Sequence, residues 1–214
     1  MENNKTLRNF LEISYGNLEI MNLKAKDRAE KSGPALLEKE YRSYLQKEKR
    51  IKAVTLCFTD LEGRFHMLDY DKKFLLDSAS NLTFDGSSIR GFSQQHESDL
   101  RLAIDWSSMR FLPADVFGPG KVMMFVDVLD RDRMPYVSDS RSQLKLYAQE
   151  LKKKDNMTVY VSAEVEGFLV DGINAEQKYE ENAFKLISTG GYYHSLPLNR
   201  LRQFIDKAAE AQRA

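Results

Sequence analysis

The chain has 214 residues, enough for one large or two small domains, and its 32 Lys and Arg residues balance its 32 Asp and Glu residues. A balanced charge provides no basic field for nucleic acid, so we expect no nucleic-acid partner. The N-terminus lacks the features of a signal peptide, and no stretch reaches the roughly 18 apolar residues of a membrane span, so we expect no membrane partner. The single cysteine, Cys57, excludes an intrachain disulfide and fits a reducing compartment. We therefore expect a soluble cytoplasmic protein.

The first fifty residues predict two helices. Apolar residues recur at about helical spacing from Leu7 to Met21, and a second apolar stripe follows the break at Gly33 and Pro34. Pro34 suits the first turn of the second helix, where its missing N–H costs no hydrogen bond. The dense charges of both signs favour a solvated helix surface over a binding patch. We expect this helical segment, residues 1–50, to dock on a neighbour or on the chain's own sheet.

After the helices the pattern changes to that of strands. Residues 51–58 and 64–70 flank a turn and predict a β-hairpin. A further strand, rich in β-branched and apolar residues, is expected over residues 121–130. Between them, residues 78–120 show few periodic signals. A connection of that length without regular structure is uncommon unless the loop is functional, so we expect a functional loop there.

A helix is expected after Ser138 and Asp139, two candidate N-cap residues. One face of this helix carries apolar residues at helical spacing, which predicts contact with a core: Leu144, Tyr147, Ala148 and Leu151. The chain then enters residues 158–170, where every second residue is apolar. That alternation predicts a strand with Glu164 and Glu166 on the same face.

The pair Glu164 and Glu166 is the first candidate site. Two like charges on one strand face repel, and a cation, a basic partner or water must offset that repulsion. Hard divalent ions such as Mg²⁺ and Mn²⁺ take oxygen ligands and often bridge phosphates, so the two glutamates are candidate metal ligands. The alternative is a solvated strand face, because charged residues are usually exposed.

Two other segments combine turn residues with hydroxyl groups or aromatic rings. Residues 84–92 have the sequence FDGSSIRGF and are followed by HESDL from His96, and residues 189–193 have the sequence TGGYY. Each segment could be only an ordered turn, since Asp-Gly and paired glycines favour turns. In this order and at these separations, the FDGSS, ESD, EVE and GGY motifs resemble those of the glutamine synthetase family. The resemblance covers roughly residue 36 to the C-terminus.

The resemblance implies an α+β fold, with a β-grasp domain over residues 51–137 and the start of an incomplete catalytic α/β domain over residues 138–214. It implies ATP-dependent ligation of ammonia to glutamate through γ-glutamyl phosphate, with Mg²⁺ or Mn²⁺ as cofactor and ATP as cosubstrate. The expected partners are glutamate, ammonium, ATP and further copies of the chain, in a homo-oligomer with active sites between subunits. The family continues beyond the equivalent of Ala214 with further ligands, so we expect this chain to be inactive alone.

The same resemblance implies roles for individual residues. Glu164 and Glu166 match the family's two metal-ligand glutamates on this strand. The expected catalytic residues are Asp85, which matches the aspartate that helps to deprotonate ammonium, Ser88, its pocket neighbour, and Tyr192, which lines the ammonium site. A carboxylate attracts NH₄⁺ and can accept its proton, so Asp85 suits that role chemically.

The EVE segment departs from the family's pattern. Val165 and Gly167 stand where the family has proline and phenylalanine, which spares both carboxylates but changes the packing expected behind them. Two alternatives to the ligase stay open. The first is a non-catalytic relative that serves as a regulatory or assembly module, and the second is a ligase that joins glutamate to another amine.

Overall fold

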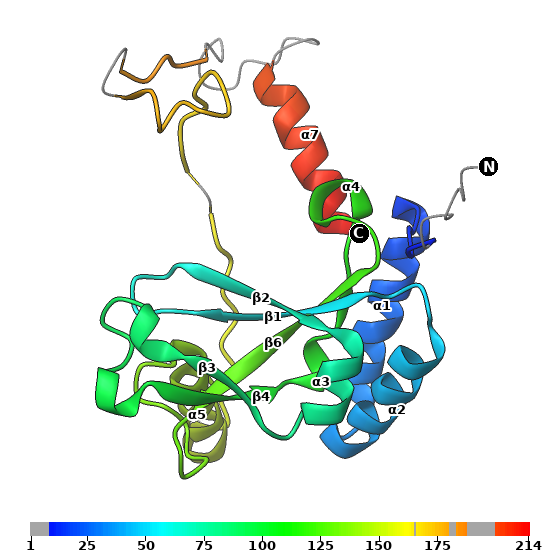
Figure 1. Ribbon diagram of the computed structural model, residues 1–214, viewed down its shortest axis with the longest axis vertical. Helices are drawn as coiled ribbons and strands as arrows, with labels where there is room; N and C mark the ends of the chain where they lie inside the picture. Colours follow the sequence, from blue (N-terminus) through cyan, green and yellow to red (C-terminus); the bar gives the residue numbers. More distant parts are fainter. Residues whose placement is uncertain (1–8, 165, 180–182, 188–199) are drawn as a thin grey trace, which may run out of the picture. The chain divides into compact units, whose positions relative to one another are not determined.

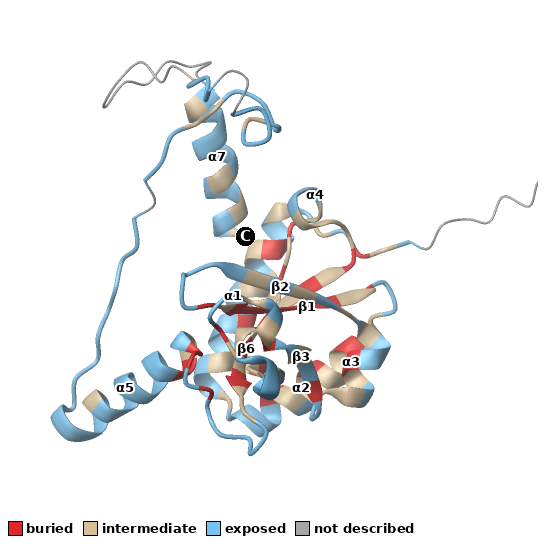
Figure 2. Cartoon of the chain, turned by 60° about the vertical axis from the view of Figure 1, so that its left-hand side comes forward, coloured by how far each residue is buried: buried red, intermediate tan, exposed pale blue. Residues whose placement is uncertain are grey.

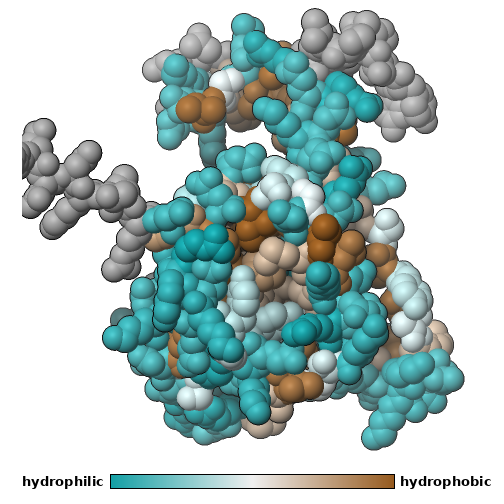
Figure 3. Space-filling view, turned by 90° about the vertical axis from the view of Figure 1, so that its right-hand side faces the viewer, coloured by the Kyte–Doolittle hydropathy of each residue, from teal (hydrophilic) through white to brown (hydrophobic). Residues whose placement is uncertain are grey.

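The computed structural model describes residues 9–164, 166–179, 183–187 and 200–214 (Figure 1). The chain divides into two compact units, one that ends at Val159 and a second that spans Tyr160–Arg213. None of the helices in the described residues is long and apolar enough to cross a membrane. The face drawn in Figure 3 is largely hydrophilic, with hydrophobic residues in small groups.

The two N-terminal helices are confirmed as α1 (Tyr15–Lys31) and α2 (Pro34–Lys47), and Pro34 opens α2 as expected. Helix α1 begins later than the apolar spacing indicates. Figure 1 shows the helices side by side, and an ion pair joins Arg28 of α1 to Glu40 of α2. Their buried faces belong to the same hydrophobic core as the sheet, so the helices dock on the chain's own sheet. The residues they contribute are Leu18, Leu37, Tyr41 and Leu45.

The sheet has six strands in the order β2-β1-β6-β4-β3, and β5 also pairs with β6. The strands β1 and β6 run parallel, and every other pair is antiparallel. The predicted hairpin is confirmed as β1 and β2, and the predicted strand over residues 121–130 is confirmed as β6. The bounds are β1 Ala53–Thr59, β2 Phe65–Asp71, β3 Leu82–Asp85, β4 Asp99–Ile104, β5 Arg110–Phe111 and β6 Lys121–Leu129.

The prediction of a long irregular loop over residues 78–120 is wrong. That segment contains β3, β4, β5, the short helix α4 (Ala114–Phe117) and three 3₁₀ turns, and it follows α3 (Lys72–Ser78). The turns are η1 Gly86–Ser88, η2 Gln95–Glu97 and η3 Trp106–Ser108. The strands here have two to six residues, too few to establish a period of two in the sequence.

Strand β6 shows how the core forms. Its residues alternate between buried and half-buried, and Val122, Met124, Val126 and Val128 are all fully buried. Each such side chain contributes about 1.5–3 kcal/mol by leaving water. Cys57 is also buried, in β1, where burial raises the pKa of its thiol to about 12. Figure 2 shows the buried residues along β1 and β6.

Helix α5 (Ser140–Asp155) follows Asp139 as predicted. The buried Asp139 carboxylate accepts hydrogen bonds from the Val128 backbone N–H, at 2.9 Å, and from the Ser142 hydroxyl. The prediction that the apolar face of α5 contacts a core is wrong, because Leu144 on that face is 67% exposed. The first turn of α5 is attached to the sheet, and Figure 2 shows most of the remaining helix as exposed. The domain boundary expected at residue 138 stays a prediction.

In the second unit, the strand predicted over residues 158–170 is absent from the described residues, which form only an isolated bridge between Val170 and Leu186. Helix α7 (Arg200–Arg213) follows further along the chain. The side chains of Tyr160, Val161 and Phe168 are 91%, 87% and 86% exposed. A strand requires a hydrogen-bonded neighbour, and no described segment pairs with this one along its length.

Candidate functional site

The FDGSS segment lies at the end of β3. Asp85 is the last residue of that strand, and the 3₁₀ turn η1 (Gly86–Ser88) follows directly. The register of β3 and β4 places Asp85 opposite Asp99. The Gly86 backbone N–H also donates a hydrogen bond to the Ser98 carbonyl, at 2.8 Å. The structure therefore brings together the FDGSS and ESD motifs that the sequence shows as separate segments.

Gly86 is required by close packing. A Cβ atom at this position would lie 2.7 Å from Leu100 Cδ1 and 2.8 Å from Ser93 Oγ, well inside ordinary contact distance. Gly86 is buried, and so is Leu100. The glycine lets the chain turn directly against β4, so the position of the loop is fixed by the sheet.

Aromatic rings hold both ends of the FDGSSIRGF segment. The Phe84 and Phe92 rings lie 4.9 Å and 5.8 Å from the ring of Phe58 on β1, measured between centroids. Phe92 also packs on Tyr136, at 5.7 Å. Such ring pairs stabilise a fold by about 0.5–1.5 kcal/mol beyond their buried area. The packed rings therefore fix both ends of the loop between Phe84 and Phe92.

The Asp85 carboxylate is exposed and accepts three hydrogen bonds from its own loop. Oδ1 accepts from the Ser87 backbone N–H, at 2.9 Å, and from the Ser87 hydroxyl, at 2.6 Å, and Oδ2 accepts from the Ser88 hydroxyl, at 3.0 Å. These bonds, first from Ser87 and then from Ser88, lower the pKa of Asp85. The carboxylate is therefore ionised at neutral pH. It can attract a cation strongly, but its lowered pKa makes it a weaker base.

The structure brings two of the three expected catalytic residues together. Ser88 lies in the same turn as Asp85 and donates a hydrogen bond to it. Tyr192 lies outside the described residues.

Asp99 is a residue that the sequence prediction did not single out. It is exposed, and its position opposite Asp85 puts two carboxylates on neighbouring strands. Like charges directly opposite each other are unfavourable, and a cation between them would offset this repulsion. Asp99 is the last residue of the ESD motif and the first residue of β4. Its place next to Asp85 depends on the strand pairing, which the sequence alone did not show.

Glu164 and Glu166 lie in the second unit, in the part without strand structure, and both are exposed. The expectation that they share a strand face therefore has no strand to support it among the described residues. Those residues also contain no group of three or more His, Cys, Asp or Glu side chains that could hold a metal ion. Mg²⁺ in proteins is often held by only one or two carboxylates, with water or substrate phosphate completing its coordination sphere. The metal assignment stays a prediction.

The mixed sheet and its helices define an α+β protein with a β-grasp domain. Residues 50–131 match the family model described as glutamine synthetase, beta-Grasp domain. The chain therefore contains the N-terminal β-grasp domain of the glutamine synthetase family. The matched residues include both the FDGSS loop and the ESD segment, which confirms the resemblance drawn from those motifs.

Curated relatives extend the match beyond this domain. A glutamine synthetase of Methanosarcina mazei is 33% identical over 171 residues, which cover 77% of this chain and 36% of the relative. A glutamine synthetase of Thermotoga maritima is 29% identical over 157 residues, which cover 73% of this chain and 35% of the relative. The chain thus spans about a third of the length of the curated relatives that it matches.

A solved structure shares the fold. The cryo-EM structure of Plasmodium falciparum glutamine synthetase matches with a TM-score of 0.50 at 24% identity. The match covers 57% of this chain and 23% of the other. At this identity the likeness concerns the fold alone.

Proposed function

We propose that this chain is part of an ATP-dependent ligase that joins ammonia to glutamate through γ-glutamyl phosphate. The proposal is supported by the β-grasp family match and by the similarity to glutamine synthetases over most of this chain. The chain spans about a third of the length of those relatives, so the ligase activity is proposed for the whole protein and not for this chain alone.

The observation that carries the proposal is the geometry of Asp85. Its carboxylate is exposed on a rigid loop, is kept ionised by Ser87 and Ser88, and faces a second acidic residue, Asp99, across the strand pair. A fixed negative group of this kind attracts NH₄⁺ by direct electrostatics. We infer that Asp85 first captures and orients ammonium. Proton removal then becomes easier as the nitrogen begins to form its bond to the acyl carbon.

The proposal includes partners and cofactors. The substrates are glutamate, ammonium and ATP, and the complete protein forms a homo-oligomer with active sites between subunits. Mg²⁺ or Mn²⁺ would neutralise charge on the transferred phosphoryl group, with Glu164 and Glu166 as two of its ligands. A cytoplasmic location is part of the proposal, in keeping with a lone buried cysteine, Cys57.

The test is Asp85→Asn in the full-length protein. The amide keeps the size of the side chain and loses its charge, so we expect the second-order rate constant for ammonium to fall by about 10²-fold or more. The half-saturation concentration of ATP and the thermal melt should change little. The matched control is Asp132→Asn, because Asp132 is an exposed aspartate in the turn after β6. Near-normal turnover of Asp85→Asn at unchanged stability would reject the catalytic role, since Asn is also a favoured turn residue.

The 214-residue chain alone should form no glutamine. We expect this because the chain spans about a third of the glutamine synthetases that it matches, and the resemblance places further metal ligands and the nucleotide- and glutamate-binding segments after Ala214. An assay of the purified chain with glutamate, ammonium, ATP and Mg²⁺ measures this directly. Glutamine above the level without enzyme would contradict the expectation.

A second candidate is a non-catalytic regulatory or assembly module with the same β-grasp domain. It is favoured by one observation, namely that the described residues contain no group of three metal-ligating side chains. Titration of the full-length protein with Mn²⁺ separates the two functions. Under the ligase proposal, replacing both Glu164 and Glu166 by Gln weakens Mn²⁺ binding and abolishes activity. Unchanged Mn²⁺ affinity in that double variant favours the module.

A further inference from the structure

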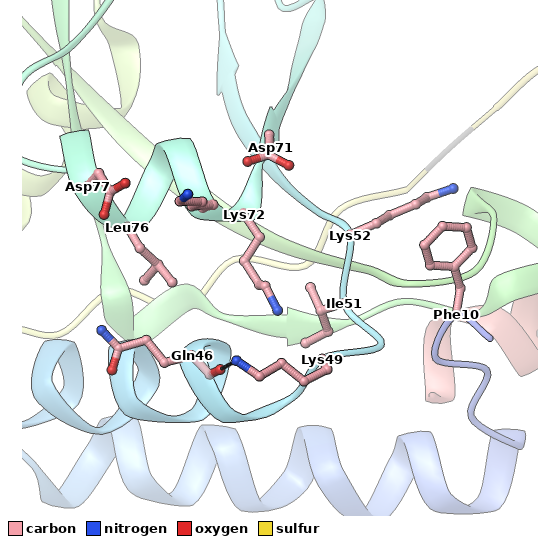
Figure 4. A pocket seen from close by; sticks show the side chains of 10 residues that line it. Phe10, Gln46, Lys49, Ile51, Lys52, Asp71, Lys72, Leu76 and Asp77 are labelled. Atoms are coloured by element: carbon pink, nitrogen blue, oxygen red, sulfur yellow. Dashed lines mark hydrogen bonds between the residues drawn. The ribbon is translucent and has the colours of Figure 1, made fainter. Parts of the chain in front are cut away.

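A cavity of about 550 Å³ lies where the end of α2, the start of β1 and the start of α3 meet (Figure 4). Its lining includes four lysines, which come from separate segments of the chain, and two aspartates. The lysines are Lys49, Lys52, Lys72 and Lys73. No part of the cavity belongs to the FDGSS loop, so its role is separate from the function proposed above.

None of the four lysines forms a salt bridge with a carboxylate in the described part of the chain. Among the described residues, the lysines that form salt bridges are all others, such as Lys121 with Asp69 and Lys145 with Asp127. With four lysines against two aspartates, the lining carries an excess of positive charge that these salt bridges do not neutralise.

The cavity lining also contains Asp71 and Asp77, and Glu48 lies next to it in the sequence; none of these three carboxylates forms a salt bridge with a cavity lysine in the described residues. Glu48 forms a two-point ion pair with Arg50, at 2.7 Å and 2.9 Å, and this interaction lowers the pKa of Glu48 to about 2. Asp71 accepts a hydrogen bond from the Phe74 backbone N–H, at 3.0 Å, and so caps α3. Neither carboxylate is held by a cavity lysine.

Lys72 is partly buried, which disfavours its charged form. Figure 4 shows its side chain extending from α3 toward α2, and its ammonium group donates to the Glu48 carbonyl oxygen, at 2.7 Å. Burial lowers the pKa of Lys72, and the nearby charge of Lys49 lowers it further. An anion in the cavity would relieve both effects, because it would favour the charged form of the amine.

Helix capping accounts for part of this arrangement. Lys49 donates to the Gln46 carbonyl oxygen, at 2.9 Å, and Lys72 to that of Glu48, so both satisfy carbonyl groups at the C-terminal end of α2. Capping does not account for Lys52 or Lys73. It also does not account for the open volume that the four side chains surround.

The cavity also has an apolar wall formed by Phe10, Ile51 and Leu76. The ammonium group of Lys52 lies 4.8 Å from the centroid of the Phe10 ring. Ligand sites typically measure about 300–1,000 Å³ and combine an apolar lining with a few polar groups, and this cavity has both properties.

We propose that this cavity binds a small molecule that carries a phosphate group joined to a flat, apolar part. Lysine binds phosphate as a point charge, and several ammonium groups around one cavity favour a doubly charged phosphate over a single carboxylate. Phe10, Ile51 and Leu76 would cover the apolar part.

The experiment is calorimetric titration of the purified chain with three probes: AMP, ribose 5-phosphate and citrate. Ionic strength is held constant and EDTA is present, so the outcome does not depend on the metal site of the proposed ligase. AMP should bind saturably and more tightly than ribose 5-phosphate, which has the same phosphate but no base. Citrate is a polyanion without phosphate and should bind more weakly than AMP.

The variants are Lys72→Gln and Lys73→Gln, with Lys39→Gln as the matched control. Lys39 is an exposed lysine on α2 that does not line the cavity, so all three variants lose the same single charge. We expect Lys72→Gln to weaken AMP binding about ten- to a hundredfold, the range for a hydrogen bond to a charged group. Lys39→Gln should leave the affinity unchanged. If the melt shows that Lys72→Gln unfolds the chain, Lys73→Gln supplies the same comparison.

Three results would overturn the proposal. The first is no saturable AMP binding at millimolar concentration. The second is equal AMP affinity in the cavity variants and in Lys39→Gln, which would mean that AMP binding depends only on the net charge of the protein. The third is another probe that binds as tightly as AMP. Citrate binding as tightly would mean that phosphate is not recognised, and ribose 5-phosphate binding as tightly would mean that the apolar part is not recognised.

Discussion

Strand β6 and the segment over residues 158–169 are both rich in alternating apolar residues, yet they differ in every structural respect. β6 lies inside the sheet, paired with β1 on one side and β4 on the other, and Val126 is fully buried. In the second segment no described residue is in a strand, and Val161 is 87% exposed. The difference teaches that alternation defines a strand only where neighbours accept its backbone hydrogen bonds.

The same contrast applies to free energy. A buried side chain of β6 gains the full benefit of leaving water, whereas an exposed side chain gains almost none. The second segment must also leave its backbone groups to water along most of its length. It therefore contributes little to the stability of the chain as described.

The first prediction tests this contrast with two identical substitutions. Val126→Ala in β6 removes two buried methyl groups and should lower the free energy of unfolding by about 2–3 kcal/mol, including the cavity that remains. Val161→Ala should change it by less than about 0.5 kcal/mol, as exposed positions usually do. Urea denaturation of both variants measures the two values. A similar loss for both would show that residues 158–169 are packed in solution.

The sequence was sufficient for those parts of the fold that are long and locally determined. The apolar stripes of α1 and α2, the proline at the start of α2 and the nine-residue alternation of β6 each contain enough residues to show a period. The strands β3 and β4 were missed because they have only four and six residues. Their existence depends on pairing with each other and with β6, which is a long-range property.

The candidate site was predictable only in part. The FDGSS and ESD motifs identified Asp85 and its serine neighbours, and the family match covers both motifs. The role of Asp99 required the register of β3 and β4, and the close approach of Gly86 to Leu100 required the packed sheet. The alternation around Glu164 predicted a shared strand face, but a pattern in one segment cannot supply the strand beside it.

The second prediction asks whether the FDGSS loop shares the stability of the sheet. Gly86→Ala introduces a Cβ atom 2.7 Å from Leu100 Cδ1, so β4 or the loop must shift. Overpacking of this kind should lower the free energy of unfolding by about 1–3 kcal/mol. The control is Gly16→Ala in α1, where no atom lies within 4 Å of the new Cβ, and this variant should be as stable as the parent or slightly more. An equally stable Gly86→Ala variant would mean that the loop is loosely held.

The third prediction concerns the attachment of α5 to the sheet. Arg141, in the first turn of α5, forms ion pairs with Asp105 and Asp127, and all three side chains are mostly buried. Arg141→Gln should lower the free energy of unfolding at pH 7 by about 1–2 kcal/mol, because it leaves Asp105 without its ion-pair partner and Asp127 with Lys145 alone. Lys145→Gln is the control. Lys145 is more exposed and pairs with Asp127 alone, so its loss should cost less than about 0.5 kcal/mol.

The stability difference between the parent and Arg141→Gln should depend on pH. Burial alone would raise the pKa of Asp105, but hydrogen bonds from Ser107 and Arg141 outweigh it and the pKa is lowered. A carboxyl with a lowered folded-state pKa stabilises the fold above its unfolded pKa of about 4, and that contribution is lost as the pH falls below it. The stability difference between the parent and Arg141→Gln should therefore be largest near neutral pH and shrink below about pH 4. A difference that stays constant down to pH 3 would show that the ion pair is not its source.

The smallest expected effect lies on the apolar face of α5. Leu144 is 67% exposed, whereas Leu75 of α3 is fully buried, so the two helices offer the same residue in opposite environments. Leu75→Ala should lower the free energy of unfolding by about 2–5 kcal/mol, and Leu144→Ala should change it by less than about 0.5 kcal/mol, since alanine is also the better helix former. Thermal and urea melts of the purified chain compare them directly. A loss above about 1 kcal/mol for Leu144→Ala would mean that this face of α5 is covered in solution, as the apolar spacing of its sequence predicts.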